Sequence, residues 1–469
     1  MFPAKTYINR REELRKKIKN GIILLPGNTE TAINYPSNTY YFRQDSSFLY
    51  YLGIDKPNLA GVIDVDDNQD ILFGNDREID DIVWMGTEES IADSARKVGV
   101  DSVKSFDKLM VILSKAIAKG KKIHFLPQYR AENSLLISTL TGINPFEINK
   151  QVSEDLIRAV ISQRIIKSDE EVNEIEKALN VSYEMNTIAM KFTKPGMMEK
   201  EIYGLIQGIV LGASAGNSFQ PIFSVHGETL HNHSYNNIME SGKLAVLDSG
   251  AESELHYASD ITRTFPVNGK FSEQQKNIYN VVLNAQLKAI EMMKPGIPYK
   301  EVHLNAAKEI TIGLQSVGLM KGNVDESVAN GAHALFFPHG LGHLLGLDVH
   351  DLEGLGENFI GYDKNVKRSE QFGLGYLRFA KPLETGHVIT VEPGIYFIPQ
   401  LIDMWKSEKK FESFIDYAEV SKYLDFGGIR IEDDVLITDT GHRVLGQPIP
   451  KTIEEVETVF LTNKPNEIK

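Results

Sequence analysis

The sequence predicts an α/β protein with an N-terminal α/β domain over residues 1–165 and a second domain, 166–469, that contains a duplicated α/β unit. Three observations lead to this prediction. The chain has 469 residues, 42% of them hydrophobic, which suffices for two or three domains with cores of their own. Short apolar runs alternate with amphipathic stretches in the first part. Two sequence patterns recur in the second part.

The N-terminal domain is predicted from short apolar runs that have the length of buried strands. They read GIILLPG at 21–27, GVIDV at 61–65 and KIHFLP at 122–127. A long polar segment with helical character follows at about 151–185. Inside it, Ser168 can cap a helix and Glu171 lies three residues further on, so a helix is expected to begin there. This restart places the domain boundary near residue 165.

The second domain is predicted to be duplicated because two patterns recur in the same order. KFTKPGMMEKEI at 191–202 returns as EMMKPGIPYKEV at 291–302. ESGKLAVLDSGAE at 240–252 returns as ETGHVITVEPGIY at 384–396, with an acidic residue six positions after a glycine in each copy. Either pair alone is explained by chance, but two pairs in order favour a duplication. Such a fold would place a site between its halves, with acids from both.

Composition excludes several classes of function. The absence of cysteine rules out disulfides, a thiol nucleophile and thiolate metal sites. A formal net charge of −14 leaves no positive excess to neutralise phosphates, so no nucleic-acid partner is expected. No apolar run approaches the roughly 20 residues that span a bilayer. The N-terminus becomes charged where a signal peptide is apolar. We therefore expect a soluble, cytoplasmic protein without a membrane partner.

Four acidic residues lie on or beside apolar, strand-like segments of the second domain: Asp248, Asp260, Glu392 and Glu432. A carboxylate at the end of a buried strand is costly unless a cation meets it. Each residue alone has an ordinary explanation, such as a turn, a helix cap or, for Glu432, an ion pair with Arg430 on the same face of an alternating strand. Together the four are better explained as oxygen ligands of metal.

Histidines gather in two segments of the second domain. They are His339, His343 and His350 in PHGLGHLLGLDVHD, and His231 and His233 in TLHNHSYNN. The first segment is not the zinc-protease HExxH helix because glycines interrupt it, and surface histidines on a turn would not need so apolar a stretch. One imidazole with four carboxylates suits Mn²⁺, Co²⁺ or Mg²⁺. Four carboxylates balance two bridged ions better than one, and two ions can activate water for hydrolysis.

These motifs resemble the five-ligand set of the pita-bread metallopeptidases, most closely the aminopeptidase P and prolidase branch. The residues that carry the resemblance are Asp248 in LDSG, Asp260 in SDITRTF, His343 in HGLGHLLGLDVHD, Glu392 in VEPGIY and Glu432 in GGIRIEDD. In addition, YYFRQDSSFLYYLGI at 40–54 resembles the N-terminal domain of both enzymes, so the resemblance covers nearly the whole chain. It implies a pseudo-twofold pita-bread fold for the second domain.

The resemblance implies a metal-binding role for each of the five residues. Asp248 would bind one metal ion, while Asp260 and Glu432 would bridge both. His343 and Glu392 would bind the other ion, and Glu392 would also shuttle a proton for the bridging hydroxide. The expected cofactor is a pair of divalent ions, Mn²⁺ first, with Co²⁺ or Zn²⁺ as alternatives.

Further residues are expected around the metals. His350 resembles the histidine that stabilises the tetrahedral intermediate, and His339 resembles a neighbour that lines the pocket. Arg430 resembles the arginine that holds the last carboxylate ligand. His231 matches a Leu-His element that precedes the first ligand. However, this chain reads LHNHSYNN where LHY is more usual, so the choice between His231 and His233 stays open.

The resemblance also implies cleavage between an N-terminal residue and a following proline. An Xaa-Pro aminopeptidase takes longer peptides, whereas prolidase takes dipeptides and needs a cation for the nearby carboxylate. The stretch FGLGYLRFAKPLETG, with Arg378, resembles the prolidase segment that supplies such an arginine. The long insertion after VEPGIYFIPQLID also resembles prolidase. The insertion at 351–376 and the N-terminal domain instead resemble bacterial Xaa-Pro aminopeptidases. The aminopeptidase is the preferred expectation, with prolidase as the alternative.

Other classes are disfavoured on the same residues. A pita-bread domain kept as a non-catalytic binding module typically loses metal ligands, and creatinase works without metal, whereas all five ligand positions are filled here. A simple methionine aminopeptidase would not need the first 150 residues. Because the N-terminal domain of the family commonly mediates dimers or tetramers, a homodimer or homotetramer is expected.

Overall fold

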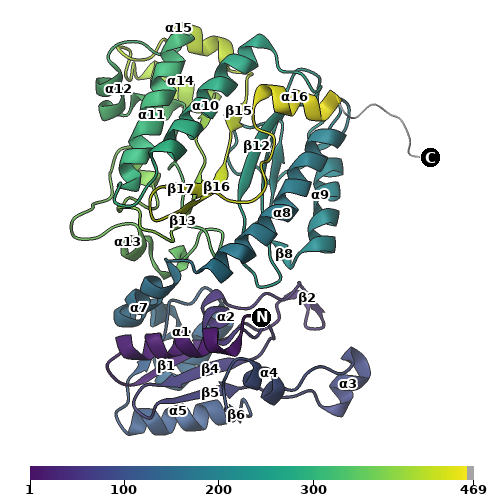
Figure 1. Ribbon diagram of the computed structural model, residues 1–469, viewed down its shortest axis with the longest axis vertical. Helices are drawn as coiled ribbons and strands as arrows, with labels where there is room; N and C mark the ends of the chain where they lie inside the picture. Colours follow the sequence, from purple (N-terminus) through teal and green to yellow (C-terminus); the bar gives the residue numbers. More distant parts are fainter. Residues whose placement is uncertain (462–469) are drawn as a thin grey trace. The chain divides into compact units, whose positions relative to one another are not determined.

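Strands and helices make up two units of the structure, a computed structural model that describes residues 1–461 (Figure 1). Unit 1 comprises Met1–Arg164 and the short piece Leu352–Phe359. Unit 2 comprises Ile165–Asp351 and the described residues from Ile360 on. The predicted mixed α/β class is confirmed, because each unit combines sheets with helices.

Unit 1 is built on a five-stranded sheet with the order β6-β5-β4-β1-β7. Its strands are β1 (Ile22–Pro26), β4 (Ala60–Asp64), β5 (Gln69–Phe73), β6 (Ser102–Lys104) and β7 (Ile123–His124). Strand β1 lies between β4 and β7, antiparallel to β4 and parallel to β7. The three apolar runs of the sequence therefore form three neighbouring strands of one sheet.

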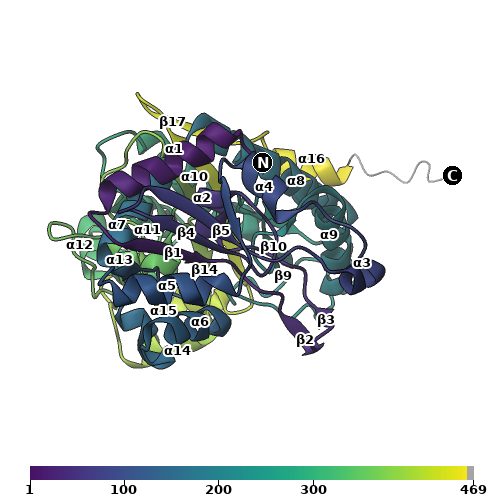
Figure 2. The same cartoon turned by 90° about the horizontal axis from the view of Figure 1, so that it is seen from below.

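Helices cover both faces of this sheet, since successive side chains of a strand point to opposite faces. Figure 2 shows α1 and α2 on one face and α5 and α6 on the other. The core on the second face contains Leu109 and Leu113 of α5 with Ile22 and Val62 of the strands. The helices and the small hairpin of unit 1 are α1 (Ala4–Lys17), β2 (Ala32–Tyr35), β3 (Asn38–Thr39), α2 (Ser46–Leu52), α3 (Ile79–Met85), α4 (Ile91–Lys97), α5 (Lys108–Ala118), α6 (Ala131–Thr141), η1 (Pro145–Lys150), α7 (Glu154–Arg164) and η3 (Glu353–Leu355).

The long polar segment forms two helices instead of one. Helix α7 ends at Arg164, and α8 (Asp169–Phe192) begins after the predicted cap. The Glu171 amide donates to Ser168 Oγ at 3.4 Å, and the Ser168 amide donates to Glu171 Oε2 at 2.9 Å. This reciprocal pair is a capping box, so the predicted helix start is confirmed.

Unit 2 contains two small three-stranded sheets, β12-β10-β9 and β13-β16-β17, with helices packed against them. Helix α8 packs on β10 and β12, whereas α10 packs on β13, β14 and β15 (Figure 1). The elements of this unit that surround the site are α9 (Glu199–Ala213), β8 (Gly216–Asn217), β9 (Ile222–Ser224), β10 (Leu244–Ser249), β11 (Ala251–Glu252), β12 (Ile261–Pro266), α10 (Glu273–Met292), α11 (Tyr299–Ser316), β13 (Val388–Val391), β14 (Gly394–Tyr396), β15 (Gly428–Arg430), β16 (Asp433–Ile437) and β17 (His442–Val444). The shorter or peripheral elements are α12 (Val324–Asn330), η2 (Ala332–Leu335), α13 (Glu357–Ile360), η4 (Leu374–Tyr376), α14 (Pro399–Ser407), α15 (Tyr417–Val420), η5 (Ser421–Tyr423) and α16 (Ile453–Leu461).

The two halves of unit 2 repeat the same local structure at the recurring patterns. Helix α8 packs on α9 as α10 packs on α11. The same backbone hydrogen bond recurs in each half, from Gly196 N to Met239 O and from Gly296 N to Leu383 O, both at 2.8 Å. Both glycines have φ near +90°, a left-handed conformation that glycine adopts without a steric cost. The recurring patterns thus mark equivalent turns of a duplicated unit.

Among the described residues, no helix combines the length and the apolarity that a membrane crossing requires.

Candidate metal centre

The predicted ligands lie where strands of unit 2 end. Asp248 is the penultimate residue of β10, and Asp260 directly precedes β12, its antiparallel partner. Glu392 directly follows β13, and Glu432 lies between β15 and β16. Because β13 pairs with β16, the carboxylates of each half emerge close together. The segment that carries His343 has no helix, as expected from its glycines.

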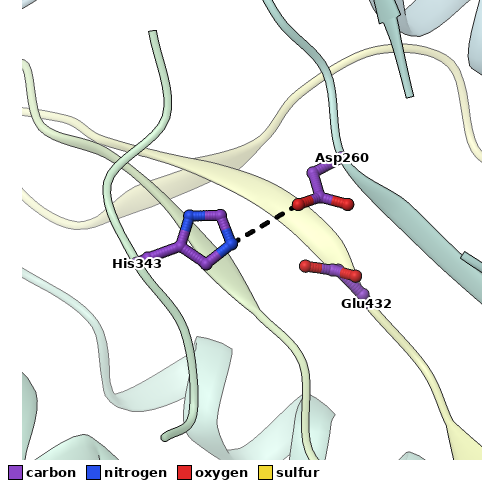
Figure 3. Close-up of side chains that lie close together, drawn as sticks. All are labelled: Asp260, His343 and Glu432. Atoms are coloured by element: carbon purple, nitrogen blue, oxygen red, sulfur yellow. Dashed lines mark ion pairs between the residues drawn. The ribbon is translucent and has the colours of Figure 1, made fainter. Parts of the chain in front are cut away.

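Three of the five predicted ligands form a close group (Figure 3). Asp260, His343 and Glu432 are buried, and each offers a ligand atom within 4.8 Å of the other two. His343 Nε2 lies 3.4 Å from Asp260 Oδ2 and 3.6 Å from Glu392 Oε1. Asp248 and Glu392 line the same cavity as this group. The structure therefore brings all five predicted ligands together.

The orientation of His343 suits a metal ligand. Its Nδ1 lies 3.1 Å from the Leu344 carbonyl oxygen, which only accepts, so Nδ1 carries the proton and Nε2 presents its lone pair to the carboxylates. Its backbone amide donates to Thr390 Oγ1 at 3.1 Å, and its carbonyl accepts from the Thr390 amide at 2.9 Å. Gly342 permits this contact, because a Cβ there would lie 2.0 Å from the Thr390 carbonyl oxygen.

The carboxylates of the site lack the partners that buried charges need. Asp248 Oδ1, Asp260 Oδ1 and Glu432 Oε1 are buried and have no hydrogen-bond partner among the described residues. Burial, and then the neighbouring carboxylates, raise the pKa of Asp260 and Glu432 well above their usual range, and burial raises the pKa of Glu392. Divalent cations would relieve this repulsion and engage the free oxygens, so the donor set fits hard divalent ions.

Arg430 is the cation that the chain itself brings closest to these carboxylates. Its Nη2 donates to Asp248 Oδ2 at 2.6 Å, and its Nη1 donates to the Tyr396 hydroxyl at 2.8 Å. The same hydroxyl lies 2.8 Å from His339 Nε2. A hydrogen-bonded chain therefore runs from Asp248 through Arg430 and Tyr396 to His339. Sequence reasoning missed Tyr396, although its place in the apolar VEPGIY pattern was a usable signal.

The partner of Arg430 differs from the sequence-based expectation. Arg430 was expected to hold Glu432, but it reaches that residue only through Thr262. The Thr262 hydroxyl accepts from Arg430 Nε at 3.2 Å and donates to Glu432 Oε2 at 2.6 Å. The alternating pattern assumed one continuous strand, whereas β15 ends at Arg430 and β16 begins only at Asp433. Because the strand is interrupted, Arg430 and Glu432 do not lie on one face of a single strand.

A cavity of about 660 Å³ in unit 2 holds this group of residues. Its lining includes all ten residues that the sequence singled out for the site, together with His233. Apolar side chains contribute the rest of the wall; the larger ones are Phe219, Ile222, Leu230, Phe372 and Tyr376. The cavity therefore combines a polar, ligand-bearing part with an apolar part, as a site for a small peptide requires.

Burial and neighbouring charges lower the pKa of three histidines of the cavity, His231, His339 and His350. The ring of His350 lies 3.9 Å from that of His343, and this neighbour, followed by burial, lowers the pKa of His350 to about 2. Burial lowers the pKa of His339 to about 3 and also lowers the pKa of His231. His231 and His233 both line the cavity, so the geometry does not choose between them.

Arg378 is a second cationic side chain that lines the cavity. It is half-buried, and its charge contributes to the low pKa of His231 and His350. The preceding backbone is pressed against Gly340, where a Cβ would lie 2.8 Å from the Leu377 Cα. This close approach fixes the segment of Arg378 beside the histidine-bearing segment.

Comparisons with known proteins agree with this geometry. Residues 173–439 match the model of metallopeptidase family M24, and residues 7–124 match that of the aminopeptidase P N-terminal domain. The Xaa-Pro dipeptidase of Homo sapiens is 33% identical over 95% of this chain and 90% of its own length. A probable Xaa-Pro aminopeptidase of Fusarium vanettenii is 33% identical over 98% of this chain and 96% of its own.

Solved structures of aminopeptidases share the fold. Zinc-substituted Escherichia coli aminopeptidase P in complex with product superposes with a TM-score of 0.82 at 28% identity, covering 99% of this chain and 100% of that one. Pseudomonas aeruginosa aminopeptidase PepP also gives a TM-score of 0.82 at 28% identity, covering 99% of both chains. The predicted order of an N-terminal domain and a pita-bread domain is thereby confirmed. This chain belongs to metallopeptidase family M24 and is a metal-dependent hydrolase.

Proposed function

We propose that this protein is an Xaa-Pro aminopeptidase, which removes the N-terminal residue from peptides with proline in second position. The observation that carries the proposal is the meeting of four carboxylates and one imidazole in a single cavity of the M24 domain. Relatives named Xaa-Pro aminopeptidase and Xaa-Pro dipeptidase, similar over at least nine-tenths of both chains, support the substrate class.

The proposal includes two divalent metal ions, Mn²⁺ first and Co²⁺ or Zn²⁺ as alternatives. Asp248 would hold one ion, and His343 with Glu392 the other, while Asp260 and Glu432 would bridge them. Four carboxylates balance the charge of two divalent ions, and three of them carry an oxygen that has no other partner among the described residues. When bound, such a pair of ions polarises a carbonyl group and lowers the pKa of water.

The side chains of the cavity have geometry that suits the remaining steps. Glu392 Oε2 lies 3.9 Å from His339 Nδ1, and burial raises the pKa of Glu392, as suits a carboxylate that accepts a proton and returns it to the leaving amine. His350 is neutral and can donate one hydrogen bond to the oxygen of the scissile carbonyl. The Arg430–Tyr396 pair orients His339 beside Glu392. His231 or His233 would contact the substrate from the opposite segment.

Prolidase activity is the second candidate, and Arg378 favours it. A dipeptide places its free carboxylate one residue from the scissile bond, and a guanidinium is the side chain best suited to bind it. Arg378 lines the same cavity as the ligands. In an aminopeptidase, the same arginine would meet the peptide backbone beyond proline without reading a carboxylate.

We also propose that the protein is a homodimer or homotetramer. Helix α3 supports this, because none of its residues is buried although Ile79, Val83 and Trp84 are apolar. These three side chains are 73%, 71% and 84% exposed. A second copy of the chain would remove such a surface from water. Light scattering should give a dimer or tetramer, and a monomeric mass would exclude both.

The test of the activity is an assay with added Mn²⁺ on an Xaa-Pro dipeptide, an Xaa-Pro-Yaa tripeptide and the matched Xaa-Ala-Yaa tripeptide. The proposal expects cleavage of the Xaa-Pro-Yaa tripeptide and none of the alanine peptide. Cleavage of the dipeptide alone would make the enzyme a prolidase. Cleavage of neither proline peptide would overturn the proposed substrate class.

Arg378→Ala separates the two candidates further. If Arg378 binds a free carboxylate, its loss removes a charged hydrogen bond, and kcat/KM for the dipeptide should fall by about 10- to 100-fold. The tripeptide should change little, because its carboxylate lies one residue further away. Unchanged dipeptide cleavage would show that Arg378 does not read the carboxylate.

A further inference from the structure

One wall of the cavity is a segment without helix or strand. Strand β9 ends at Ser224, and residues 225–237 form irregular structure up to the next paired residue. This segment, called here the histidine loop, contributes Leu230, His231 and His233 to the cavity. Six of its thirteen residues are exposed, His231 and His233 among them, so burial of the two histidines does not fix their positions.

A single buried carboxylate ties both ends of the histidine loop. Glu199, the first residue of α9, is 0% exposed. At the start of the loop it accepts hydrogen bonds from Ser224 Oγ at 3.0 Å and from the Val225 amide at 2.8 Å. At the end of the loop it accepts from the Asn237 amide at 3.1 Å and from Asn237 Nδ2 at 3.0 Å. The carboxylate therefore closes the loop at its base.

A relay extends this anchor to the middle of the loop. Besides donating to Glu199, the Ser224 hydroxyl accepts from Asn232 Nδ2 at 2.9 Å and from the His226 amide at 3.0 Å. Asn232 lies between the two candidate histidines, and its Oδ1 accepts from the Ser234 amide at 3.0 Å. Asn232 belongs to the LHNHSYNN stretch, in which this chain departs from the family pattern.

The second half of unit 2 uses the equivalent position for the same purpose. Tyr299 occupies the place of Glu199 in the repeated Lys-Pro-Gly pattern and is the first residue of α11. Its hydroxyl donates to the Thr390 carbonyl at 2.6 Å, and Thr390 holds both backbone polar groups of His343. In each half, a buried polar side chain at the helix start thus holds a histidine-bearing wall of the cavity.

We propose that Glu199 is a positioning residue of this peptidase: through Ser224 and Asn232 it sets the position of the loop histidine that contacts the substrate. The inference rests on the proposed function, because it assigns the histidine loop to substrate binding. Glu199 itself neither lines the cavity nor touches a candidate metal ligand. Loosening the loop should therefore weaken substrate binding while leaving the metal ions in place.

The first test compares Asn232→Ala with Asn236→Ala. Asn236 lies in the same loop but is exposed, and its Nδ2 donates a long hydrogen bond, 3.4 Å, to Ser234 Oγ. Asn232→Ala should raise KM for an Xaa-Pro-Yaa tripeptide about 3- to 10-fold, the size expected for one lost hydrogen bond, with kcat and bound metal changed less than about twofold. Asn236→Ala should behave as wild type. Equal KM values for the two variants would overturn the proposal.

The second test acts nearer the anchor. Ser224→Ala removes the relay but keeps the bonds of Glu199 to the Val225 and Asn237 amides, and Ser327→Ala is a matched control at a fully buried serine of the same unit. Glu199→Gln replaces one acceptor oxygen by an NH₂ donor, which would face the backbone amide donor of Val225 or of Asn237, so it should raise KM most. If that variant fails to fold, Ser224→Ala still decides, with KM raised relative to the control.

Amide hydrogen exchange separates this inference from the proposed function. Ser224→Ala should speed exchange in residues 225–237 and leave β10 and β13 unchanged. If the wild type cleaves no Xaa-Pro peptide, the proposed function fails, and the exchange result then judges the anchor alone. Unchanged exchange in the histidine loop would overturn the anchor whatever the activity of the enzyme.

Discussion

Asp433 and Glu432 are neighbouring buried carboxylates of unit 2, and they differ in the cations that the chain places beside them. Asp433 is held by two of the chain's own cations, with Oδ1 at 2.7 Å from Arg263 Nη2 and Oδ2 at 2.5 Å from Lys451 Nζ. Among the described residues, its neighbour Glu432 pairs with no arginine or lysine, and Glu432 Oε1 has no hydrogen-bond partner. Burial opposes ionisation at both, but Arg263 and Lys451 hold the pKa of Asp433 below its usual value, whereas the pKa of Glu432 is raised.

The contrast between Asp433 and Glu432 indicates which carboxylates would bind a cation from solution. One residue from the site, the chain supplies enough positive charge to satisfy a buried carboxylate. In the cavity, Arg430 pairs with Asp248, whereas Asp260 and Glu432 form no ion pair with an arginine or lysine within residues 1–461. A chain that can neutralise one carboxylate and leaves its neighbours without a cation has a site that is completed from solution.

The largest effect is expected from removing a bridging carboxylate. Asp260→Ala or Glu432→Ala should lower kcat/KM for an Xaa-Pro peptide by at least about 1,000-fold, because the metal pair supplies several kcal/mol of transition-state stabilisation. The fold should survive, since each change removes a carboxylate that is repelled in the metal-free state. Circular dichroism melting in the presence of EDTA checks this, and a metal-free variant that melts well below the wild type would contradict it.

Removing the Asp433 carboxylate, which is paired with Arg263 and Lys451, should lower stability without changing the chemistry of the site. Asp433→Ala leaves Arg263 buried without its carboxylate, which costs about 3–5 kcal/mol of unfolding free energy. Urea unfolding with EDTA measures this loss, and the exposed pair of Lys276 with Glu273 gives the control, because Glu273→Ala should cost less than about 1 kcal/mol. The comparison would fail if Asp433→Ala proved as mild as the control.

A buried side chain that stays neutral needs no counterion, and His303 and His333 are examples. Neither ring nitrogen of either residue has a hydrogen-bond partner among the described residues, and burial lowers the pKa of His303 to about 3 and of His333 to about 4. Since the unfolded chain takes up these protons below about pH 6.5, their contribution to stability is complete above that pH and is lost as the pH falls.

A variant isolates this effect from the carboxylates of the site, whose raised pKa values act in the opposite direction. The unfolding free energy of wild type relative to His333→Phe should fall by about 1.4 kcal/mol per pH unit between pH 6.5 and 4. Denaturant titrations with EDTA at three pH values measure this slope. A difference that does not vary with pH would mean that His333 titrates normally in the folded protein.

The features that depend on local sequence could be predicted. Ser168 and Glu171 form the expected capping box, the first apolar run forms β1, and Asp248 and Glu392 lie at the ends of β10 and β13 as the apolar runs indicated. Local propensity and hydrophobic pattern decide all of these, and both are legible in a single chain.

The remaining features depend on contacts between distant segments. The Arg430–Asp248 pair joins two residues that lie 182 positions apart, and no turn motif in the sequence marks the break between β15 and β16. Glu199 looks like an ordinary acidic residue in the first turn of α9, yet it is fully buried because its partners come from residues 224–237. Long-range hydrogen bonds of this kind are not visible in hydrophobic patterning.

If the unpartnered carboxylate oxygens of the cavity bind divalent cations that the enzyme needs, removing and restoring the metal should switch its activity off and on. The most direct measurement strips the protein of metal and titrates Mn²⁺ back, following binding by calorimetry and cleavage of an Xaa-Pro-Yaa peptide in the same samples. We expect no cleavage by the stripped protein, two Mn²⁺ bound per chain and activity that returns as they bind. Full activity of the stripped protein would contradict this expectation.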